Sequence, residues 1–263
     1  MISVTLMGGM GNQMFQYALG RSLSIKNRLP MNLDLSFLNR RDFGPNFVYR
    51  NYDLDIFNIN PNFGTGGDIV KEPHFQYSED LLNMNIDRHI NIEGYWQTPK
   101  YFNNIEDIIR NDFQFNDIVP ESDLLSSIRK SNSVMINVRR TDYLNTDFHG
   151  VMGNDYVMRA VEIIKSKVES PNYFIFSDDV QWCIENIHLE NMTIVDHSYA
   201  GDKFNYYLQL MINCKHFIIP NSSFAWWSAW LNTNTDKIVI APKNWFNMDI
   251  DTSDLIPDNW VRI

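Results

Sequence analysis

The sequence predicts an α/β protein with parallel sheets, and three observations support this class. Between about residues 130 and 240, short apolar runs of strand type alternate with helical stretches that carry an apolar stripe. The polar turns between these segments are short, which favours parallel strands joined by right-handed helical crossovers. The beginning of the chain repeats the order of strand, loop and helix. We therefore expect two α/β halves of similar size.

The first element expected is a strand over Ile2–Met7, followed by a glycine-rich turn over Gly8–Gln13 and a helix over Met14–Lys26. A turn of this kind lets backbone N–H groups approach an anion or a sugar closely. Three of its residues are therefore candidate ligand contacts: Gly9, Gly11 and Asn12.

The same turn is close to the GxGxxG fingerprint of dinucleotide-binding proteins, but Met14 stands where the third glycine is required. A second strand over Leu29–Leu35 would place Asp34 near its carboxyl end, within reach of a ribose or another sugar. A dinucleotide-dependent oxidoreductase therefore stays open as an alternative, as does a plain tight turn.

The middle of the first half has weaker signals. Residues 39–59 are polar and aromatic and are expected to be irregular, residues 60–67 should form a loop, and a helix is expected over Phe102–Phe113. Three residues before this helix could stack on and hydrogen-bond a sugar, although a role in the core is equally consistent with their types: Tyr95, Trp96 and Gln97.

A domain boundary is expected near Pro120, ahead of a helix over Ser122–Lys130 and a strand at Val134–Val138. This strand is apolar on both sides, which is typical of a strand buried on both faces. Further elements follow in alternation: helix Tyr156–Val168, strand Tyr173–Phe176, helix Val180–Asn186, strand Met192–Val195, helix Phe204–Cys214, strand His216–Ile219, helix Phe224–Leu231 and strand Lys237–Ile240.

Polar side chains follow these strands at the sheet edge where α/β proteins bind ligands. The fork of Arg139 can give a phosphate two parallel hydrogen bonds, and Asp142 could hold its guanidinium in place, although a purely structural pair is also possible. Asp178 or Asp179 could accept from N1–H and N2–H₂ of guanine together, and so select a guanine nucleotide. Capping of the next helix is the alternative.

Composition narrows the class of partner. The chain has 263 residues, 44% hydrophobic and 14% aromatic, and a formal charge of −10 that opposes binding to DNA or RNA. Cys183 and Cys214 lack metal-ligand spacing, so we expect free thiols in a reducing compartment, with the cytoplasm as the expected location. Neither a signal peptide nor a membrane span is visible, so any membrane contact should be peripheral, at the inner face of the cytoplasmic membrane.

Taken together, eight ordered blocks over nearly the whole chain resemble bacterial members of glycosyltransferase family 11, the α-1,2-fucosyltransferases. The blocks are GGMGNQMFQYALG, RNYDLDIF, GYWQTPKYF, NVRRTDYL, FSDD, CKHFIIPNSSFAWWSAWLN, APKNWF and IPDNWVRI. The resemblance implies a GT-B architecture, in which two Rossmann-like domains face a central cleft. It further implies GDP-β-L-fucose as donor, inversion to an α-linkage, a galactose-terminated glycan as acceptor, and no required metal or cofactor.

On this resemblance, residues 1–120 form an N-terminal acceptor-side domain, 121–245 a donor-binding domain, and 246–263 a segment that packs back on the N-terminal domain. Tyr95, Trp96, Gln97 and Asp34 become acceptor contacts. The glycine turn, the Asp178–Asp179 pair and the strand ends become donor contacts, to which the resemblance adds a phosphate cradle: Asn221, Ser222, Ser223 and Phe224.

The resemblance assigns Arg139 to the β-phosphate of the donor. Asp147 is the expected general base, because related α-1,6-fucosyltransferases carry a carboxylate at this spacing after the motif aspartate, and His149 is its rival. Asn137 is counted as a donor contact although the family usually has histidine there, and asparagine accepts no proton near pH 7. Tyr207 stands where many relatives have an acidic residue.

Two DxD sequences, at Asp53–Asp55 and Asp249–Asp251, have the spacing that metal-dependent glycosyltransferases use at a diphosphate. Neither follows a clear apolar strand, so we interpret both as structural or solvated and expect activity without a metal. Besides the transferase, a nucleotide-sugar-binding protein without turnover stays open, supported by Asn137 alone.

Overall fold

The computed structural model describes residues 1–44, 47–146 and 148–263, which form two compact units. Unit 1 comprises residues 1–116 and 250–257, and unit 2 comprises residues 117–249 and 258–263. The chain therefore passes from unit 1 to unit 2 shortly before Pro120, and its last residues divide between the two units.

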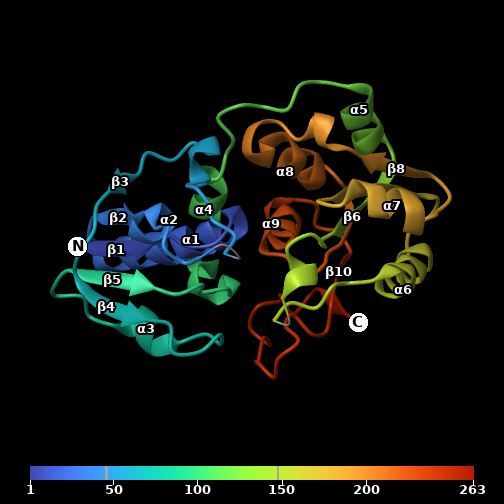
Figure 1. Cartoon of the computed structure of the whole chain (residues 1–263). Coiled ribbons are helices and arrows are strands. Elements are labelled where there is room, and N and C mark those ends of the chain that lie inside the picture. Colours follow the sequence, from blue (N-terminus) through green and yellow to red (C-terminus); the bar gives the residue numbers. More distant parts are fainter. Residues whose placement is uncertain (45–46, 147) are drawn as a thin grey trace. The chain divides into compact units, whose positions relative to one another are not determined.

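Unit 1 is built on a five-stranded sheet in the order β3-β2-β1-β5-β4, with all described pairs parallel. The strands and helices of this unit are labelled in Figure 1. Their bounds are β1 Ile2–Thr5, α1 Met10–Asn27, β2 Met31–Asp34, α2 Ser36–Asn39, β3 Asn62–Phe63, β4 Asp68–Lys71, α3 Glu79–Asn83, β5 Ile90–Glu93 and α4 Glu106–Asp112.

Helix α1 begins earlier than predicted. Gly9 is its N-cap, and the backbone N–H groups of Asn12 and Gln13 both donate to the Gly9 carbonyl, so the second half of the expected turn is the first turn of the helix. The turn itself is short and passes through Gly8, whose φ of 74° favours glycine. Further along, Gly20 lets α1 approach β1, because an added Cβ would lie 2.4 Å from Val4 Cγ2.

Unit 2 contains a six-stranded parallel sheet in the order β11-β10-β9-β6-β7-β8. The bounds are α5 Asp123–Lys130, β6 Asn132–Val138, α6 Asn154–Lys165, β7 Pro171–Ser177, α7 Val180–Asn186, β8 Met192–Val195, α8 Asn205–Ile212, β9 His216–Ile218, α9 Ser223–Leu231, β10 Val239–Ala241 and β11 Val261–Arg262. The parallel α/β class predicted from the sequence is thus confirmed in both units.

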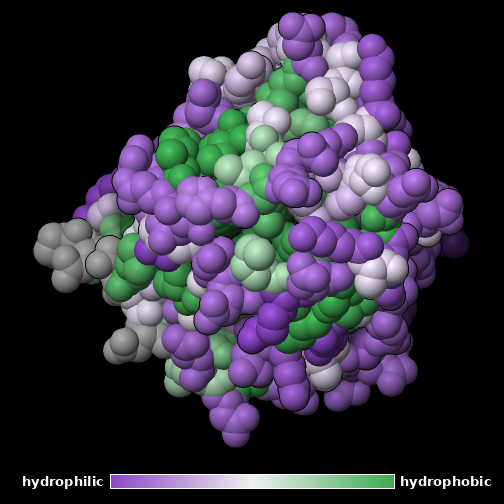
Figure 2. Space-filling view, turned by 90° about the vertical axis from the view of Figure 1, so that its right-hand side faces the viewer, coloured by the Kyte–Doolittle hydropathy of each residue, from purple (hydrophilic) through white to green (hydrophobic). Residues whose placement is uncertain are grey.

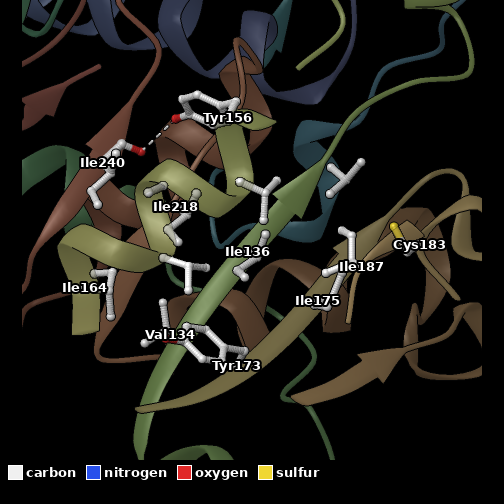
Figure 3. Close-up of a cluster of buried hydrophobic side chains, with 14 of the residues drawn as sticks. Val134, Ile136, Tyr156, Ile164, Tyr173, Ile175, Cys183, Ile187, Ile218 and Ile240 are labelled. Carbon is white, nitrogen blue, oxygen red and sulfur yellow. Dashed lines mark hydrogen bonds between the residues drawn. The ribbon is translucent and has the colours of Figure 1, made fainter. Parts of the chain in front are cut away.

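The central strand β6 is buried on both faces, as its apolar sequence predicts. Val134 and Ile136 face a cluster that includes Ile164 of α6 and Ile187 beyond α7 (Figure 3). Each such fully buried aliphatic side chain contributes about 1.5–3 kcal/mol to stability. On the other face, Phe176 of β7 packs edge-on against the ring of Tyr207 in α8, at a centroid distance of 5.0 Å. Side chains of helices thus pack against both faces of this sheet.

Some short elements were not predicted. Strand β3 lies inside the loop expected over residues 60–67, and strand β11 pairs in parallel with β10 through Ile240 and Val261. Residues 250–257 are anchored in unit 1, where Asp254 accepts from the Thr98 hydroxyl through its carbonyl and pairs with Lys100 through its carboxylate.

The surface in Figure 2 is mostly hydrophilic, with separate green patches where hydrophobic residues reach it. Across the described ranges, no helix combines the length and the apolar character needed to cross a membrane.

Candidate active site

The carboxyl ends of β6 and β7 are tied together by Asp178. Its Oδ1 accepts from the backbone N–H of Arg140 at 2.9 Å, and its Oδ2 accepts from both the N–H and the hydroxyl of Thr141. Since Val138 is paired with Ser177 in the sheet, these bonds continue the strand register into the loop. Both oxygens of Asp178 are occupied within the unit, which makes Asp178 a loop anchor.

Arg139 is held in place by carboxylates. Its Nη2 donates to Asp142 Oδ2 at 2.6 Å, its Nη1 lies 3.4 Å from Asp178 Oδ2, and its Cζ lies 5.6 Å from the ring centroid of Tyr143. Burial lowers the pKa of Arg139, but the hydrogen bond to Asp142 and the charges of Asp178 and Asp142 outweigh it, so the pKa is raised. With 27% of its side chain exposed, this permanently charged guanidinium can still meet a ligand.

Arg140 has a different environment. Its Nε lies 3.4 Å from Asp179 Oδ2, and its guanidinium stacks over the ring of Trp182 at 4.1 Å. Asp179 also caps α7, because its Oδ1 accepts from the Trp182 N–H at 3.1 Å. The capping alternative considered for this pair is therefore realised at Asp179, and Arg140 is a structural partner of the cap.

Tyr143 links Arg139 to the neighbouring strand end. The hydroxyl of Tyr143 donates to the Asn221 carbonyl at 2.9 Å, and the ring of His149 stacks on the Tyr143 ring at 4.3 Å with an interplanar angle of 8°. Tyr143 was not predicted as a site residue, although its place four residues after Arg139 was a usable signal. We refer to Arg139, Asp142, Tyr143 and His149 as the arginine cluster.

His149 has the properties of a neutral base. Burial lowers its pKa, with an opposing effect from Asp142 and a further lowering from Arg139. Its Nδ1 is buried and has no hydrogen-bond partner among the described residues. Asp147, the expected base, lies outside the described residues.

The turn between β9 and α9 closes the cluster on the side of Asn221. Ser222 is the N-cap of α9 without a side-chain cap bond, and Ser223 and Phe224 are half-buried at the helix start, where N–H groups favour anions. Asn221 itself is 1% exposed, and its amide donates to the carbonyls of Gly150 and Trp245. Asn221 thus fixes the surrounding loops through its Nδ2, whereas its Oδ1 is buried without a partner among the described residues, and its contact with the donor stays a prediction.

The two departures from the family pattern both have internal partners. Asn137 is half-buried and donates through Nδ2 to the Phe176 carbonyl at 3.1 Å. Tyr207 is buried, donates to the Val195 carbonyl and accepts from the Ser177 N–H, so it bridges the ends of β7 and β8. Tyr207 thus supports the strand ends instead of offering a charged ligand contact.

In unit 1, the glycine turn and the loop after β5 are joined directly. Gln97 Nε2 donates to Asn12 Oδ1 at 2.7 Å, and Gln97 Oε1 is buried with no partner among the described residues. Gly9 and Gly11 stand on either side of the start of α1, and Tyr95 is half-buried at the surface of this loop.

Two of the expected acceptor contacts are almost fully buried. Asp34 is 3% exposed, and its carboxylate accepts from the Ser36 N–H and from Asn91 Nδ2, so it holds the strand ends together. Trp96 is 1% exposed, so its ring packs in the core. The sequence pattern could not separate these roles, because burial is set by distant parts of the chain.

Within the described ranges, no group of three or more His, Cys, Asp or Glu side chains is suited to a metal, and the two DxD sequences have partners inside the protein. The backbone N–H of Asp53 donates to Gln13 Oε1, and its Oδ2 accepts from Gln13 Nε2. Asp251 accepts from the Ser253 N–H and from Gln76 Nε2. Their polar atoms serve the packing of unit 1.

Several known proteins resemble this chain over most of its length. The α-1,2-colitosyltransferase of Escherichia coli is 31% identical, covering 98% of this chain and 97% of that protein, and the O-antigen biosynthesis glycosyltransferase WbnK of Escherichia coli is 30% identical, covering 98% and 99%. The galactoside α-(1,2)-fucosyltransferase 1 of Sus scrofa is 26% identical over 65% of this chain and 50% of its own length.

Among solved structures, fucosyltransferase NodZ from Bradyrhizobium superposes with a TM-score of 0.51 at 12% identity, covering 87% of this chain and 92% of that one. This likeness confirms the predicted GT-B architecture of two Rossmann-like domains. The profile of glycosyl transferase family 11 matches residues 1–263. The strand-end arginine cluster, the full-length relatives and this match together show that the chain belongs to glycosyl transferase family 11.

Proposed function

We propose that this protein transfers L-fucose from GDP-β-L-fucose to the 2-hydroxyl of a terminal β-galactoside, with inversion to an α-linkage. The observation that carries the proposal is Arg139, a partly exposed guanidinium held by Asp142 at the carboxyl end of β6. Membership of family 11 and the name of the Sus scrofa relative support the transferred sugar and the acceptor.

The reaction requires the protein to stabilise the leaving group and to accept a proton. As the C–O bond to GDP breaks, charge grows on the β-phosphate, and Arg139 with the N–H groups at the start of α9 would stabilise it. The acceptor hydroxyl must also lose a proton, which we assign to Asp147, with His149 as the second candidate. Asp179 would read the guanine, with Ser222, Ser223 and Phe224 at the phosphates.

Charge stabilisation by arginine and a helix start makes a metal unnecessary in this proposal. Arg139 has a raised pKa and stays charged at every working pH, so it supplies the positive charge that a divalent ion would otherwise bring to the diphosphate.

The identity of the transferred deoxy sugar is the most specific part of the proposal. Colitose is fucose without the 3-hydroxyl, so a site that hydrogen-bonds this hydroxyl would reject GDP-colitose strongly, whereas a site built for colitose would lose little with either sugar. We favour fucose because the mammalian relatives and the NodZ structure carry that name.

The test is a direct assay. The protein is incubated with GDP-fucose or GDP-colitose and a panel of β-galactosides, and GDP release, acceptor mass and the anomeric configuration of the product are measured. Transfer of fucose with an α-linkage is expected. Faster transfer of colitose would show that GDP-colitose, and not GDP-fucose, is the donor. GDP binding without any product would favour a binding protein without turnover, the alternative that Asn137 supports.

A further inference from the structure

The side chain of Glu72 is hydrogen-bonded to the backbone of the loop that follows β5. Glu72 lies directly after β4, and its backbone N–H donates to the Glu93 carbonyl at 2.9 Å, which continues the ladder between β4 and β5. Its carboxylate then turns to the loop, where Oε2 accepts from the Tyr95 N–H at 2.7 Å and Oε1 from the Trp96 N–H at 2.8 Å. Both oxygens thus bind consecutive backbone amides with charge-assisted bonds.

The loop adopts its conformation around this carboxylate. Trp96 has a φ of 56°, in the left-handed region, which costs a non-glycine residue on the order of 1–3 kcal/mol and persists only where the surroundings enforce it. Gly94 is required beside it, because an added Cβ would lie 2.4 Å from Glu72 Cβ. The Glu72 carboxylate and the buried Trp96 ring therefore hold a strained turn in a single arrangement.

The Glu72 carboxylate is buried at an energetic cost. Burial raises its pKa, and the hydrogen bonds from Tyr95 and Trp96 and the neighbouring His74 only partly oppose that shift. Since the ionised group is less favourable here than in water, it lowers the stability of unit 1 at neutral pH. A feature that costs stability and holds a strained turn is typical of a functional site.

The turn presents groups suited to a sugar. Tyr95 is half-buried, and its ring is stacked on Phe75 at 6.5 Å with an interplanar angle of 14°. Gln97 is fixed by its bond to Asn12, and its buried Oε1 is a spare acceptor for a hydroxyl group. An aromatic face beside an amide acceptor can stack on and hydrogen-bond a pyranose.

We propose that Glu72 is a positioning residue for the acceptor: it acts through the Tyr95–Gln97 turn and sets the geometry of the galactoside subsite. The inference rests on the proposed transferase function, and it adds a residue that neither the sequence pattern nor the family blocks single out. It does not make Glu72 a base, because both of its oxygens are occupied by backbone amides.

The test compares Glu72→Gln with Glu93→Gln. Glutamine has one acceptor oxygen and an NH₂ group, so it leaves one of the two backbone amides facing a donor. Glu93 precedes Gly94 on the adjacent strand, but its side chain is 36% exposed and only approaches Lys71 at 3.9 Å, so Glu93→Gln is a matched control.

For Glu72→Gln we expect at least a tenfold rise in the acceptor KM, with the donor KM and the GDP affinity within twofold of the unchanged protein. Hydrogen exchange of the Tyr95 and Trp96 amides should accelerate at least tenfold. The Glu93→Gln variant should match the unchanged protein in every measurement.

Two results would overturn the inference: accelerated exchange with an unchanged acceptor KM, or an equal loss of donor and acceptor affinity together with a lower Tm, as expected of a merely structural residue. Calorimetry with a β-galactoside disaccharide reads acceptor affinity without turnover. If the unchanged protein binds the disaccharide but transfers nothing, the proposed function fails while the role of Glu72 is still decided by the binding and exchange data.

Discussion

Arg139→Lys is the most informative single substitution. Lysine keeps the charge but has a single ammonium group, which cannot keep the bond to Asp142 and also give a phosphate two parallel bonds. Losing one preorganised charged donor at a developing anion costs about 2.7–4 kcal/mol, which corresponds to roughly 10²–10³ in kcat. GDP affinity should fall by about tenfold or less, because the charge on the β-phosphate is smaller before the bond breaks.

The assay measures kcat with saturating acceptor and GDP affinity by calorimetry. Arg140→Lys is the control, since Arg140 is already engaged by Asp179 and by the face of Trp182, and its rate should stay within about tenfold of the unchanged protein. If Arg139→Lys were nearly fully active while Arg140→Lys were inactive, the two arginines would have been assigned the wrong roles. An equal loss in GDP affinity and in kcat would show that Arg139 binds the ground state and the transition state alike.

Asp179→Asn should relax the preference for GDP over UDP and ADP in calorimetry while α7 persists, because asparagine is also a good N-cap; an unchanged preference would remove Asp179 as the guanine contact. Asp147→Asn should lower kcat by roughly 10²–10⁴-fold at nearly normal GDP affinity, and a loss below tenfold would shift the base role to His149. Burial holds the pKa of His149 below 6.5, so it is neutral at pH 7, and a rate that depends on neutral His149 should fall only in more acidic buffer; a rate already falling between pH 8 and 7 would exclude it. Treatment with EDTA should leave the rate unchanged, and recovery of a lost rate by Mg²⁺ or Mn²⁺ alone would contradict the arginine mechanism.

Local signals explain which elements the sequence predicts well. Helix α7 and strand β8 coincide with their predicted bounds, because Asp179 is a clear N-cap and the apolar run of β8 is bounded by polar residues. Strands β3 and β11 have two residues each and exist only through pairing with strands elsewhere in the chain, so no local pattern could reveal them.

The same distinction holds at the site. Arg139 and Asp142 are three residues apart, so their ion pair could be predicted from the sequence. Whether Trp96 faces a ligand or the core depends on residues distant in sequence. The same is true of the hydrogen bond that the Asp34 carboxylate accepts from Asn91. Glu72 was overlooked because its partners lie more than twenty residues away along the chain.

The path of the last residues has a practical consequence for protein engineering. Residues 250–257 are part of unit 1, and β11 then adds the edge strand to the sheet of unit 2. A cut at the single junction near residue 117 therefore does not release two self-contained fragments, since the C-terminal fragment would carry eight residues whose packing partners were left behind. A chimaera that exchanges unit 2 between relatives would need matched junctions at 116/117, 249/250 and 257/258, with residues 250–257 kept from the parent that supplies unit 1.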